Sequence, residues 1–503
     1  MALYGGDSIL AMEIERAKGA LVWDGAWANV VGVLTGGVLL VGFALELGAG
    51  PLTIGILGAV PFFSQLAQIP AIVLIERLRE RRRIAIIAAT GSRTVVLGLA
   101  FIPFIDDRQL ALAFLVLGCI VIATLGAVGA CAWNSWMHDL LPKEQLGRIF
   151  SRRLFWATGF ALAAGLGSGL VIDHWPSGSR LYAYSVLFGA GAIAGFLSSF
   201  WLSRVPEPPM RQEGERPPLI EMLSAPLRDP GFRPLLVFNG LWNFASNLTA
   251  PFFAVYFMQQ LGLALGTVVG LWAVSQLANM LTLQVWGRLS DRLSNRAILA
   301  VGAPVYLGAI LALPFAALPA PHALTVPVLG VIHIVMGTAT AAIGLAAGNI
   351  GLKSAPVGRA TEYLASMSLV GSLAAGVAPL LGGAVARLLE QQEFAIVIHL
   401  GAAGAGTNVT ALRFQHWEFL FALSFVVGLY AVYALSRVRE GRQVSEREVI
   451  QMFFLEARRT MRSLSTVSGL RVATLFPLGW LTSARPEEPA RWSGPSRKSG
   501  RDD

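Results

Sequence analysis

The sequence predicts an all-α integral membrane protein in which twelve transmembrane helices form two six-helix repeats, and three observations lead to this class. First, 55% of the 503 residues are hydrophobic and only 14% are charged, whereas soluble domains carry about 25% charged residues. Second, apolar runs of about 20 residues recur along the chain, each long enough to cross a roughly 30 Å hydrocarbon layer. Third, the two halves of the chain share short motifs in the same order.

The apolar runs predict the twelve helices, with ends fixed to within about 2–4 residues. Six of them lie in each half of the chain. They cover Asp24–Leu45, Leu52–Ile75, Ile84–Ile105, Leu110–Ala132, Leu154–Ile172, Tyr182–Leu202, Pro234–Phe257, Leu265–Trp286, Ala297–Leu318, Leu324–Gly348, Thr361–Leu388 and Phe419–Ser436.

The segments between the runs divide the chain into a first bundle at 1–203, a linker rich in Pro, Glu and Arg at 204–233, a second bundle at 234–437 and a tail at 438–503. In the tail, Ser445-Glu-Arg-Glu448 has the pattern of a capping box at a helix start. Apolar residues follow at near-helical spacing, with arginines among them. The tail therefore predicts a basic amphipathic helix on the cytoplasmic leaflet, with disorder beyond it.

The charges of the loops predict the orientation. The loops that follow odd-numbered helices hold only Arg108, Arg180, Arg387 and Arg413, whereas the other loops and the linker are rich in arginine and lysine. Basic loops stay in the cytoplasm, so both termini should be cytoplasmic, as in a prokaryotic inner membrane. We assign the net charge of +9 to this bias rather than to a nucleic-acid partner. The long loop before the last helix predicts an external β-hairpin from Phe394–Leu400 and Val409–Phe414.

An internal repeat supports two bundles of the same topology. Four pairs of motifs occur in order, and their first positions differ by 215, 214, 211 and 211 residues. Six helices separate the copies, so the repeat is parallel, with its axis along the membrane normal. The pairs are Asp24–Trp27 with Asn239–Trp242, Glu46–Gly48 with Gln260–Gly262, Arg77–Arg81 with Arg288–Arg292, and Gly147–Arg148 with Gly358–Arg359.

The loop Gly287-Arg-Leu-Ser-Asp-Arg292, followed by Asn295-Arg296, resembles the signature loop of the major facilitator superfamily. The copy in the first half, Glu76-Arg-Leu-Arg-Glu-Arg81, has glutamates in place of the glycine and the aspartate. Pro142–Arg148 is similar to the family's loop between helices 4 and 5. The resemblance covers about residues 20–437 and implies a secondary transporter that works by alternating access.

The resemblance also implies a gate. Asp291 would face the start of helix 5 and Glu80 the start of helix 11, because an acidic group is stabilised at the positive end of a helix. A glycine such as Gly287 is expected where backbones crowd. The alternative interpretation is that the basic residues of this loop only fix the membrane topology and have no gating role. The candidate gating residues are Glu80, Arg81, Gly287, Asp291, Arg292, Gly147, Arg148, Gly358 and Arg359.

In this family helices 1, 4, 7 and 10 mainly line the substrate cavity, and the resemblance carries candidates over by position. Each candidate could instead bridge helices, since amides bind neighbouring helices together in membranes. The set is neutral and aromatic, which favours a neutral or amphiphilic organic solute over a sugar phosphate. The candidates on helices 1, 7 and 10 are Trp27, Asn29, Asn243, Asn247 and His333, and further candidates on helices 2, 8 and 11 are Gln65, Gln276 and Ser366.

Two charges within predicted helices need a reason, because a charge at the bilayer centre costs roughly 2.5–3.5 kcal/mol or more. Asp24 is either a proton-coupling carboxylate or a helix cap paired with a neighbour. Arg93 either extends toward the cytoplasm or forms an ion pair with Asp24.

The predicted function is secondary active transport of a small organic solute, with proton-coupled export as the first hypothesis and metabolite uptake as an alternative. The sequence has no glycine-rich loop followed by Lys-Ser or Lys-Thr to hold ATP phosphates. We expect no cofactor, no metal and no enzymatic activity, and a monomer in the bilayer that uses protons. A non-transporting assembly or delivery factor of the same fold is the rival hypothesis.

Overall fold

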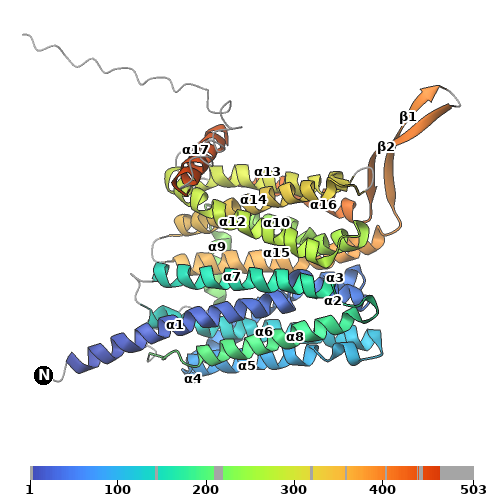
Figure 1. Cartoon of the computed structure of the whole chain (residues 1–503). Coiled ribbons are helices and arrows are strands. Elements are labelled where there is room, and N and C mark those ends of the chain that lie inside the picture. The colour runs from blue at the N-terminus through green and yellow to red at the C-terminus, as the bar shows by residue number, and fades with distance from the viewer. Residues whose placement is uncertain are drawn as a thin grey trace, which may run out of the picture.

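The computed structural model describes residues 4–141, 146–208, 219–317, 321–356, 359–402, 405–438, 440 and 446–464. Its helices lie side by side in two groups that follow the two halves of the chain (Figure 1). The blue-to-green helices of the first half form one group, and the yellow-to-orange helices of the second half form the other.

Several spans of the first half are built from more than one helical segment. The first span breaks at Gly36 and Gly37, where Gly37 has a φ of 53° that favours glycine. The second changes to a 3₁₀ helix midway. The segments are α1 (Tyr4–Thr35), α2 (Gly37–Glu46), α3 (Pro51–Phe63), η1 (Ser64–Ala67), α4 (Gln68–Leu78), α5 (Arg81–Leu99), η2 (Ile102–Phe104), α6 (Arg108–Leu140), α7 (Leu146–Asp173), η3 (Ser177–Ser179) and α8 (Arg180–Leu202).

The second half follows a short connecting helix, α9 (Leu219–Arg228). Its first span is interrupted at Pro251 and ends in the π-helix η4, a geometry that often marks functional sites. The segments are α10 (Arg233–Thr249), α11 (Phe252–Val255), η4 (Tyr256–Gln260), α12 (Leu265–Arg292), α13 (Asn295–Ala312), η5 (Pro314–Ala317), α14 (Thr325–Ser354), α15 (Ala360–Leu388), α16 (Trp417–Leu435) and α17 (Glu446–Leu464).

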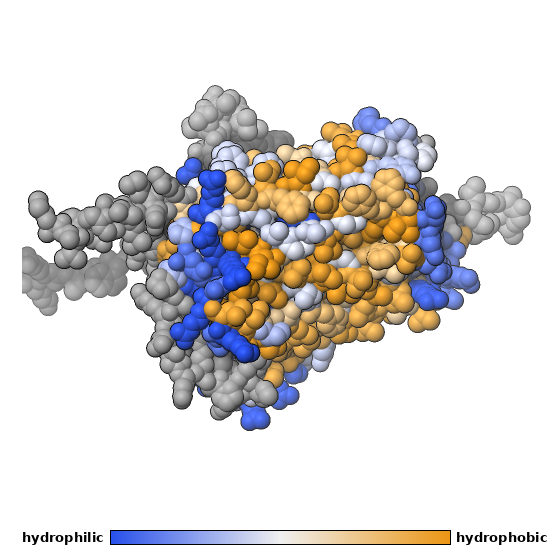
Figure 2. Space-filling view, turned by 90° about the horizontal axis from the view of Figure 1, so that it is seen from below, coloured by the Kyte–Doolittle hydropathy of each residue, from blue (hydrophilic) through white to orange (hydrophobic). Residues whose placement is uncertain are grey.

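The helix content confirms the predicted fold class. Among the described residues, eleven helices are long and apolar enough to cross a membrane. The interrupted segment α10–α11–η4 supplies the remaining span of the predicted twelve. Figure 2 shows an apolar belt on one face between two hydrophilic ends, as expected for a multi-pass membrane protein.

Several helices extend beyond their predicted ends. Helix α1 begins at Tyr4, well before the expected Asp24, and α14 ends at Ser354 rather than Gly348. Hydropathy marks only the part of a helix that lies in hydrocarbon, whereas the hydrogen-bonded helix continues into polar sequence.

One hydrophobic core joins the two halves at one end of the molecule. We call the end with the α4–α5 turn, residues 204–208 and α17 the linker end, and the opposite end the hairpin end. Toward the hairpin end, Phe43 and Ile54 of the first half share a buried cluster with Phe252 and Leu265 of the second. Toward the linker end, each half has a core of its own. The bundles therefore meet at the hairpin end and separate toward the linker end.

Glycines allow the halves to approach closely at the hairpin end. A Cβ atom added to Gly55 of α3 would overlap the carbonyl oxygen of Pro379 in α15. One added to Gly169 of α7 would lie 2.7 Å from the Cα atom of Gly266 in α12. Small residues permit such backbone contacts between membrane helices, and here they hold the two bundles together.

The predicted hairpin is confirmed. Strand β1 (Glu393–Ala402) pairs antiparallel with β2 (Ala405–Gln415), and Glu393 is opposite Gln415 at its base. Figure 1 shows the hairpin standing away from the helices at the hairpin end. Gln415 at this base donates its backbone N–H to Glu418 Oε2 of α16 at 2.7 Å.

Candidate functional site

Asp24 is a carboxylate buried inside the first bundle, with 4% of its surface exposed. Ser198 of α8 donates its hydroxyl to Asp24 Oδ1 at 2.8 Å, and Arg153 of α7 donates Nη2–H to Oδ2 at 3.4 Å. Arg153 also donates Nε–H to the carbonyl of Leu21 at 3.2 Å and lies over the ring of Trp133. A single ionisable group therefore connects α1, α7 and α8.

Arg93 lies near this carboxylate but is not its hydrogen-bonded partner. Its charge acts on Asp24 at longer range, and its side chain packs against Gly195, where an added Cβ atom would lie 2.7 Å from Arg93 Cγ. Its Nη1–H donates to Ser92 Oγ at 3.3 Å, while its Nε has no hydrogen-bond partner among the described residues. The partner of Asp24 is instead Arg153, which lies one residue before the predicted helix start at Leu154 and is therefore in a predicted loop.

Three asparagines form a ladder along one face of α10. Asn239 is buried and donates its amide to the carbonyl of Met367 in α15 at 2.8 Å. Asn243 donates to the carbonyl of Asn239 at 2.8 Å, and Asn247 donates to the carbonyl of Asn243 at 2.8 Å. A carboxamide has two donor hydrogens and an acceptor oxygen, so Asn243 and Asn247 retain hydrogen-bonding capacity. They are half-buried, and the structure thus places two predicted candidates on one face.

Four further candidates for the substrate cavity lie on helices other than α10. Asn29, Gln65 and Gln276 are exposed on α1, η1 and α12, respectively. Trp27 is half-buried and packs edge-on against Phe160, with ring centroids 5.5 Å apart.

Two candidates are engaged within their own helices. His333 Nδ1 lies 2.8 Å from the carbonyl oxygen of Leu329, and its ring is 5.5 Å from that of Phe257 near the π-helix. Ser366 is buried and donates its hydroxyl to the carbonyl of Glu362 at 3.0 Å. Both hydrogen bonds lie within a single helix, so they do not connect neighbouring helices.

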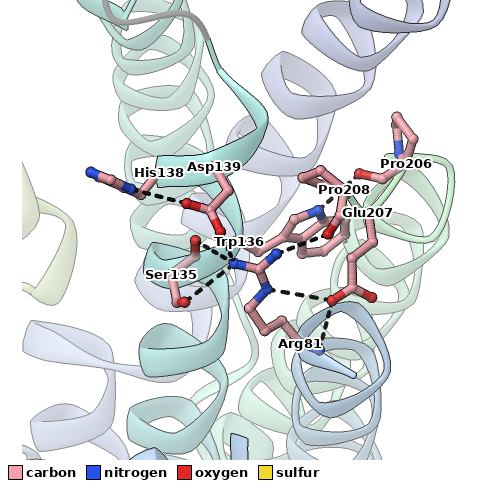
Figure 3. Close-up of polar contacts among 8 residues, drawn as sticks. All are labelled: Arg81, Ser135, Trp136, His138, Asp139, Pro206, Glu207 and Pro208. Atoms are coloured by element: carbon pink, nitrogen blue, oxygen red, sulfur yellow. Dashed lines mark hydrogen bonds and ion pairs between the residues drawn. The ribbon is translucent and has the colours of Figure 1, made fainter. Parts of the chain in front are cut away.

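Arg81, the first residue of α5, is fully buried at the linker end (Figure 3). Its backbone N–H donates to Glu207 Oε1 at 2.8 Å, and its Nη1 donates to the carbonyl of Ser135 at 3.1 Å. Nη2 donates to the carbonyl of Pro208 at 2.9 Å, and the guanidinium also forms an ion pair with Asp139. Arg81 thereby connects the start of α5 with the end of α6 and the segment after α8.

The second half contains the corresponding contact. Glu440, which follows α16, accepts Nδ2–H from Asn295 at 2.7 Å and the backbone N–H of Arg296 at 2.6 Å. Arg296 donates Nη2–H to the carbonyl of Ser436 at 3.0 Å, as Arg82 does to the carbonyl of Ser203. A glutamate that follows the sixth span of each half therefore caps the third span.

These contacts arise from a repeat that the sequence analysis missed. The segment 200–207, Phe-Trp-Leu-Ser-Arg-Val-Pro-Glu, matches 433–440, Tyr-Ala-Leu-Ser-Arg-Val-Arg-Glu. Arg204 lies over the Phe200 ring at 4.5 Å and Arg437 over the Tyr433 ring at 5.2 Å. The copies differ by 233 positions, because the hairpin lengthens the loop before α16. A search that allowed for this insertion would have found the repeat.

Of the two expected gate contacts, only that of Glu80 involves an acidic side chain that the structure describes. Glu80 is exposed and pairs with Arg83 in its own turn, Oε2 to Nη1 at 2.9 Å, because the halves are apart at the linker end. Gly287 lies within α12, where an added Cβ atom would meet nothing within 4 Å. The expectation of backbone crowding at Gly287 is therefore wrong for this conformation. The residue with a left-handed backbone conformation is instead Arg79, in the α4–α5 turn of the first half, with a φ of 54°.

The remaining gating candidates either make contacts within their own half or lie outside the described residues. Arg359 caps α15 and pairs with Glu362, Nη2 to Oε2 at 2.6 Å. Arg292 Nη1 lies 3.9 Å from Glu456 Oε2. The side chains of Arg148 and Asp291 lie outside the described residues, as does the whole of Gly358. Gly147 is in the first turn of α7.

The tail helix α17 docks on the second bundle. Val449 is fully buried there, and Phe453 stacks on Trp286 of α12 with ring centroids 4.5 Å apart. Arg288 Nη1 pairs with Glu456 Oε1 at 2.9 Å. The tail was expected to bind the cytoplasmic leaflet, but its apolar face packs against α12 and α13 because protein surface with complementary charge is available. The expected cap Ser445 lies outside the described residues.

These features define a membrane protein of two related bundles that meet at one end, with buried polar groups inside each bundle. The sequence profile of the Major Facilitator Superfamily matches residues 25–379. The chain belongs to this superfamily and is a membrane transporter of its type.

Solved structures share the fold at low sequence identity. The nucleoside transporter NupG superposes with a TM-score of 0.60 at 12% identity, covering 86% of this chain and 100% of its own. The inward-open xylose transporter XylE from E. coli has a TM-score of 0.58 at 14% identity, covering 88% and 99%. An inward-facing bacterial homologue of the human lysosomal transporter Spinster has a TM-score of 0.55 at 14% identity, covering 90% and 98%. No protein of curated function matches the chain in sequence.

Proposed function

We propose that this chain transports a small organic solute by alternating access and couples the movement to protons through Asp24. The observation that carries the proposal is the burial of Asp24 between Ser198 and Arg153. Protonation would remove the attraction between Asp24 and Arg153, and a buried charge without its partner is costly.

Helix α7 connects this carboxylate with the contact between the halves. The helix carries Arg153 toward the linker end and, near the hairpin end, Asp173, whose Oδ2 accepts the backbone N–H of Gly266 at 2.9 Å. Gly169 of the same helix packs on Gly266. A shift of α7 on protonation of Asp24 therefore acts directly on the contact between α7 of the first half and α12 of the second half.

The charge bias supports a cytoplasmic linker end. The α4–α5 turn alone holds Arg77, Arg79, Arg81, Arg82 and Arg83, and basic loops remain in the cytoplasm. With this orientation both termini are cytoplasmic, the hairpin is external, and the conformation is inward-facing. Two of the structures with the same fold are also described as inward-open or inward-facing.

The available side chains support a neutral or amphiphilic solute. Asn29, Asn243, Asn247 and Gln276 offer amides that both donate and accept hydrogen bonds. The similar structures include a nucleoside transporter and a xylose transporter, whose named solutes are hydroxylated and uncharged. Proton-coupled export is our first hypothesis for the direction, and uptake of a metabolite is the alternative.

The test uses purified protein in liposomes with a pH-sensitive dye inside and a panel of nucleosides, pentoses and amphiphilic drugs. Solute-driven proton movement is expected for the wild type, and Asp24→Asn should abolish it while solute exchange persists. Asp106→Asn, at an exposed position of the hairpin end, is the matched control. Loading the solute inside or outside separates export from uptake. A folded protein that moves no solute in either direction would contradict transport and favour the assembly role.

A further inference from the structure

A polar pocket lies at the base of the hairpin, away from the residues assigned to transport. It has a volume of about 350 Å³ and is lined by the end of η4, the segment after α15, and the junction of β2 with α16. Sites for small molecules have volumes of about 300–1,000 Å³. This pocket is therefore the size of a single sugar ring or a small amine.

Glutamine side chains dominate its wall. They are contributed by three separate segments of the chain, namely Gln259, Gln391 with Gln392, and Gln415. A carboxamide can pair with both a donor and an acceptor, so a wall of carboxamides fits a molecule with several hydroxyl groups. Among the lining residues that the structure describes, none is a lysine or arginine, which disfavours phosphates and carboxylates.

The wall also carries negative charge. Glu390 and Glu393 both line the pocket. Beneath it, the buried carboxylate of Glu418 accepts a hydrogen bond from Gln260 at 2.5 Å. Carboxylates attract a cation, and a hydrogen bond to a charged group is stronger than one between neutral groups. The pocket therefore favours a protonated amine over a neutral molecule of the same shape.

His416 shows that the backbone of the pocket is strained. Its φ of 40° is in the left-handed region, although it is not a glycine. Its ring is tilted by 32° against that of Trp417, with ring centroids 3.9 Å apart, and its Nε2 is enclosed without a hydrogen-bond partner among the described residues. Strained backbone and unsatisfied polar atoms collect at ligand sites. Burial also lowers the pKa of His416, which favours the neutral form of its ring.

We infer that this pocket is a binding site, separate from the transport pathway, for a small hydroxylated amine such as an amino sugar. The carboxamides of Gln391, Gln392 and Gln415 bind the hydroxyl groups, and the carboxylate of Glu390 binds the ammonium group. Because the pocket opens beside the hairpin at the end opposite the linker, its ligand comes from the external side.

Calorimetric titration of the purified full chain in nanodiscs with three probes tests the inference. Glucosamine carries both hydroxyls and an ammonium group, glucose only the hydroxyls, and tetramethylammonium only the charge. Glucosamine should bind about tenfold more tightly than either of the others, since one charged hydrogen bond contributes about that factor. Equal binding of glucose and glucosamine would overturn the proposed ligand class.

Variants locate the site. Glu390→Gln and Gln392→Ala should each weaken glucosamine binding about tenfold. Glu46→Gln and Gln109→Ala, which change exposed residues of the same end in the first half, should leave it unchanged. Unchanged melting temperatures show that the variants are folded.

A third comparison separates this site from transport. Asp24→Asn should leave glucosamine binding unchanged even if it abolishes proton coupling. Loss of binding in Asp24→Asn, or undiminished binding in both pocket variants, would overturn the inference.

Discussion

Glu207 and Glu440 occupy equivalent positions in the two halves, and each accepts a backbone N–H at the start of the third span of its half. The distances are 2.8 Å from Arg81 to Glu207 and 2.6 Å from Arg296 to Glu440. Four N–H groups at the start of a helix have no partner within it, and a carboxylate there also interacts favourably with the helix dipole. The segment that leaves each bundle therefore stabilises the bundle it leaves.

Replacement of Glu207 by Gln should lower the free energy of unfolding by about 2 kcal/mol. The variant keeps the shape of the side chain but removes the charge that faces the fully buried Arg81. Glu80→Gln removes an exposed partner of Arg83 and should change stability by less than about 0.5 kcal/mol. Thermal unfolding of both proteins in detergent measures the difference. Equal melting temperatures would show that Glu207 contributes nothing.

Much of the fold could be predicted because the signals are local. Apolar runs fix the spans, and Asp24 stands out because an acid within such a run is expensive. The hairpin was also predictable from the two apolar strands that flank a Gly/Ala-rich stretch. Each of these patterns depends only on neighbouring residues.

The polar contacts could not be predicted in the same way, because they join distant segments. Arg81 and Glu207 are 126 positions apart, and nothing in the local sequence of either residue indicates the other. Hydropathy predicts the start of the helix at Leu154, which leaves Arg153 in the preceding loop. The helix in fact begins at Leu146, which places Arg153 two turns inside it and opposite Asp24.

Asp24 and Arg153 should show a coupling free energy of about 1–3 kcal/mol in a double-mutant cycle. The pair is largely removed from water, with side-chain exposures of 6% and 23%, so each single change leaves an unpaired group. The variants are Asp24→Asn, Arg153→Met and their combination, and chemical unfolding measures each. The more exposed pair Arg359 and Glu362 is the control and should give about 0.3–0.5 kcal/mol. Additive effects at Asp24 and Arg153 would contradict the proposed interaction.

Gly55→Val should shift the protein away from the conformation that is closed at the hairpin end. The new side chain would collide with Pro379 in the opposite half, so the two bundles must separate there. A cysteine introduced at the buried Leu265, in a background without Cys119 and Cys131, reports the opening by its rate of alkylation. We expect this rate to rise about tenfold, which corresponds to about 1.4 kcal/mol.

Gly50→Ala is the control for this experiment. Gly50 has a φ of −84° that any residue adopts, and an added Cβ atom would meet nothing within 4 Å. In this variant, the alkylation rate of the cysteine at position 265 should equal the rate in the protein that retains Gly55 and Gly50. An unchanged rate in folded Gly55→Val would show that the Gly55 contact does not hold the two halves together.

Phe453→Ala should release the tail helix from the second bundle. The variant removes the stacked ring on Trp286, and a loss of about 2 kcal/mol from this burial and stacking raises the undocked population about 30-fold. Trypsin cleavage at Arg447 should accelerate by the same factor, because cleavage follows the open population. Gln451→Ala changes an exposed residue of the same helix and should have no effect. Equal cleavage of both variants would contradict docking through Phe453.

Tyr363→Phe should reduce the acid sensitivity of the contact between the linker and α15. The hydroxyl of Tyr363 donates to Asp229 Oδ2 at 2.8 Å, and the backbone N–H of Gly231 donates to Oδ1 at 2.8 Å. These hydrogen bonds, with that of Tyr363 the largest cause, hold the pKa of Asp229 below its usual value of 3.8. A depressed pKa contributes stability that is present above the unfolded value and is lost as pH falls through the folded value. The wild type should therefore lose stability between about pH 5 and about pH 2 more steeply than Tyr363→Phe, and parallel melting curves over this range would exclude the contribution.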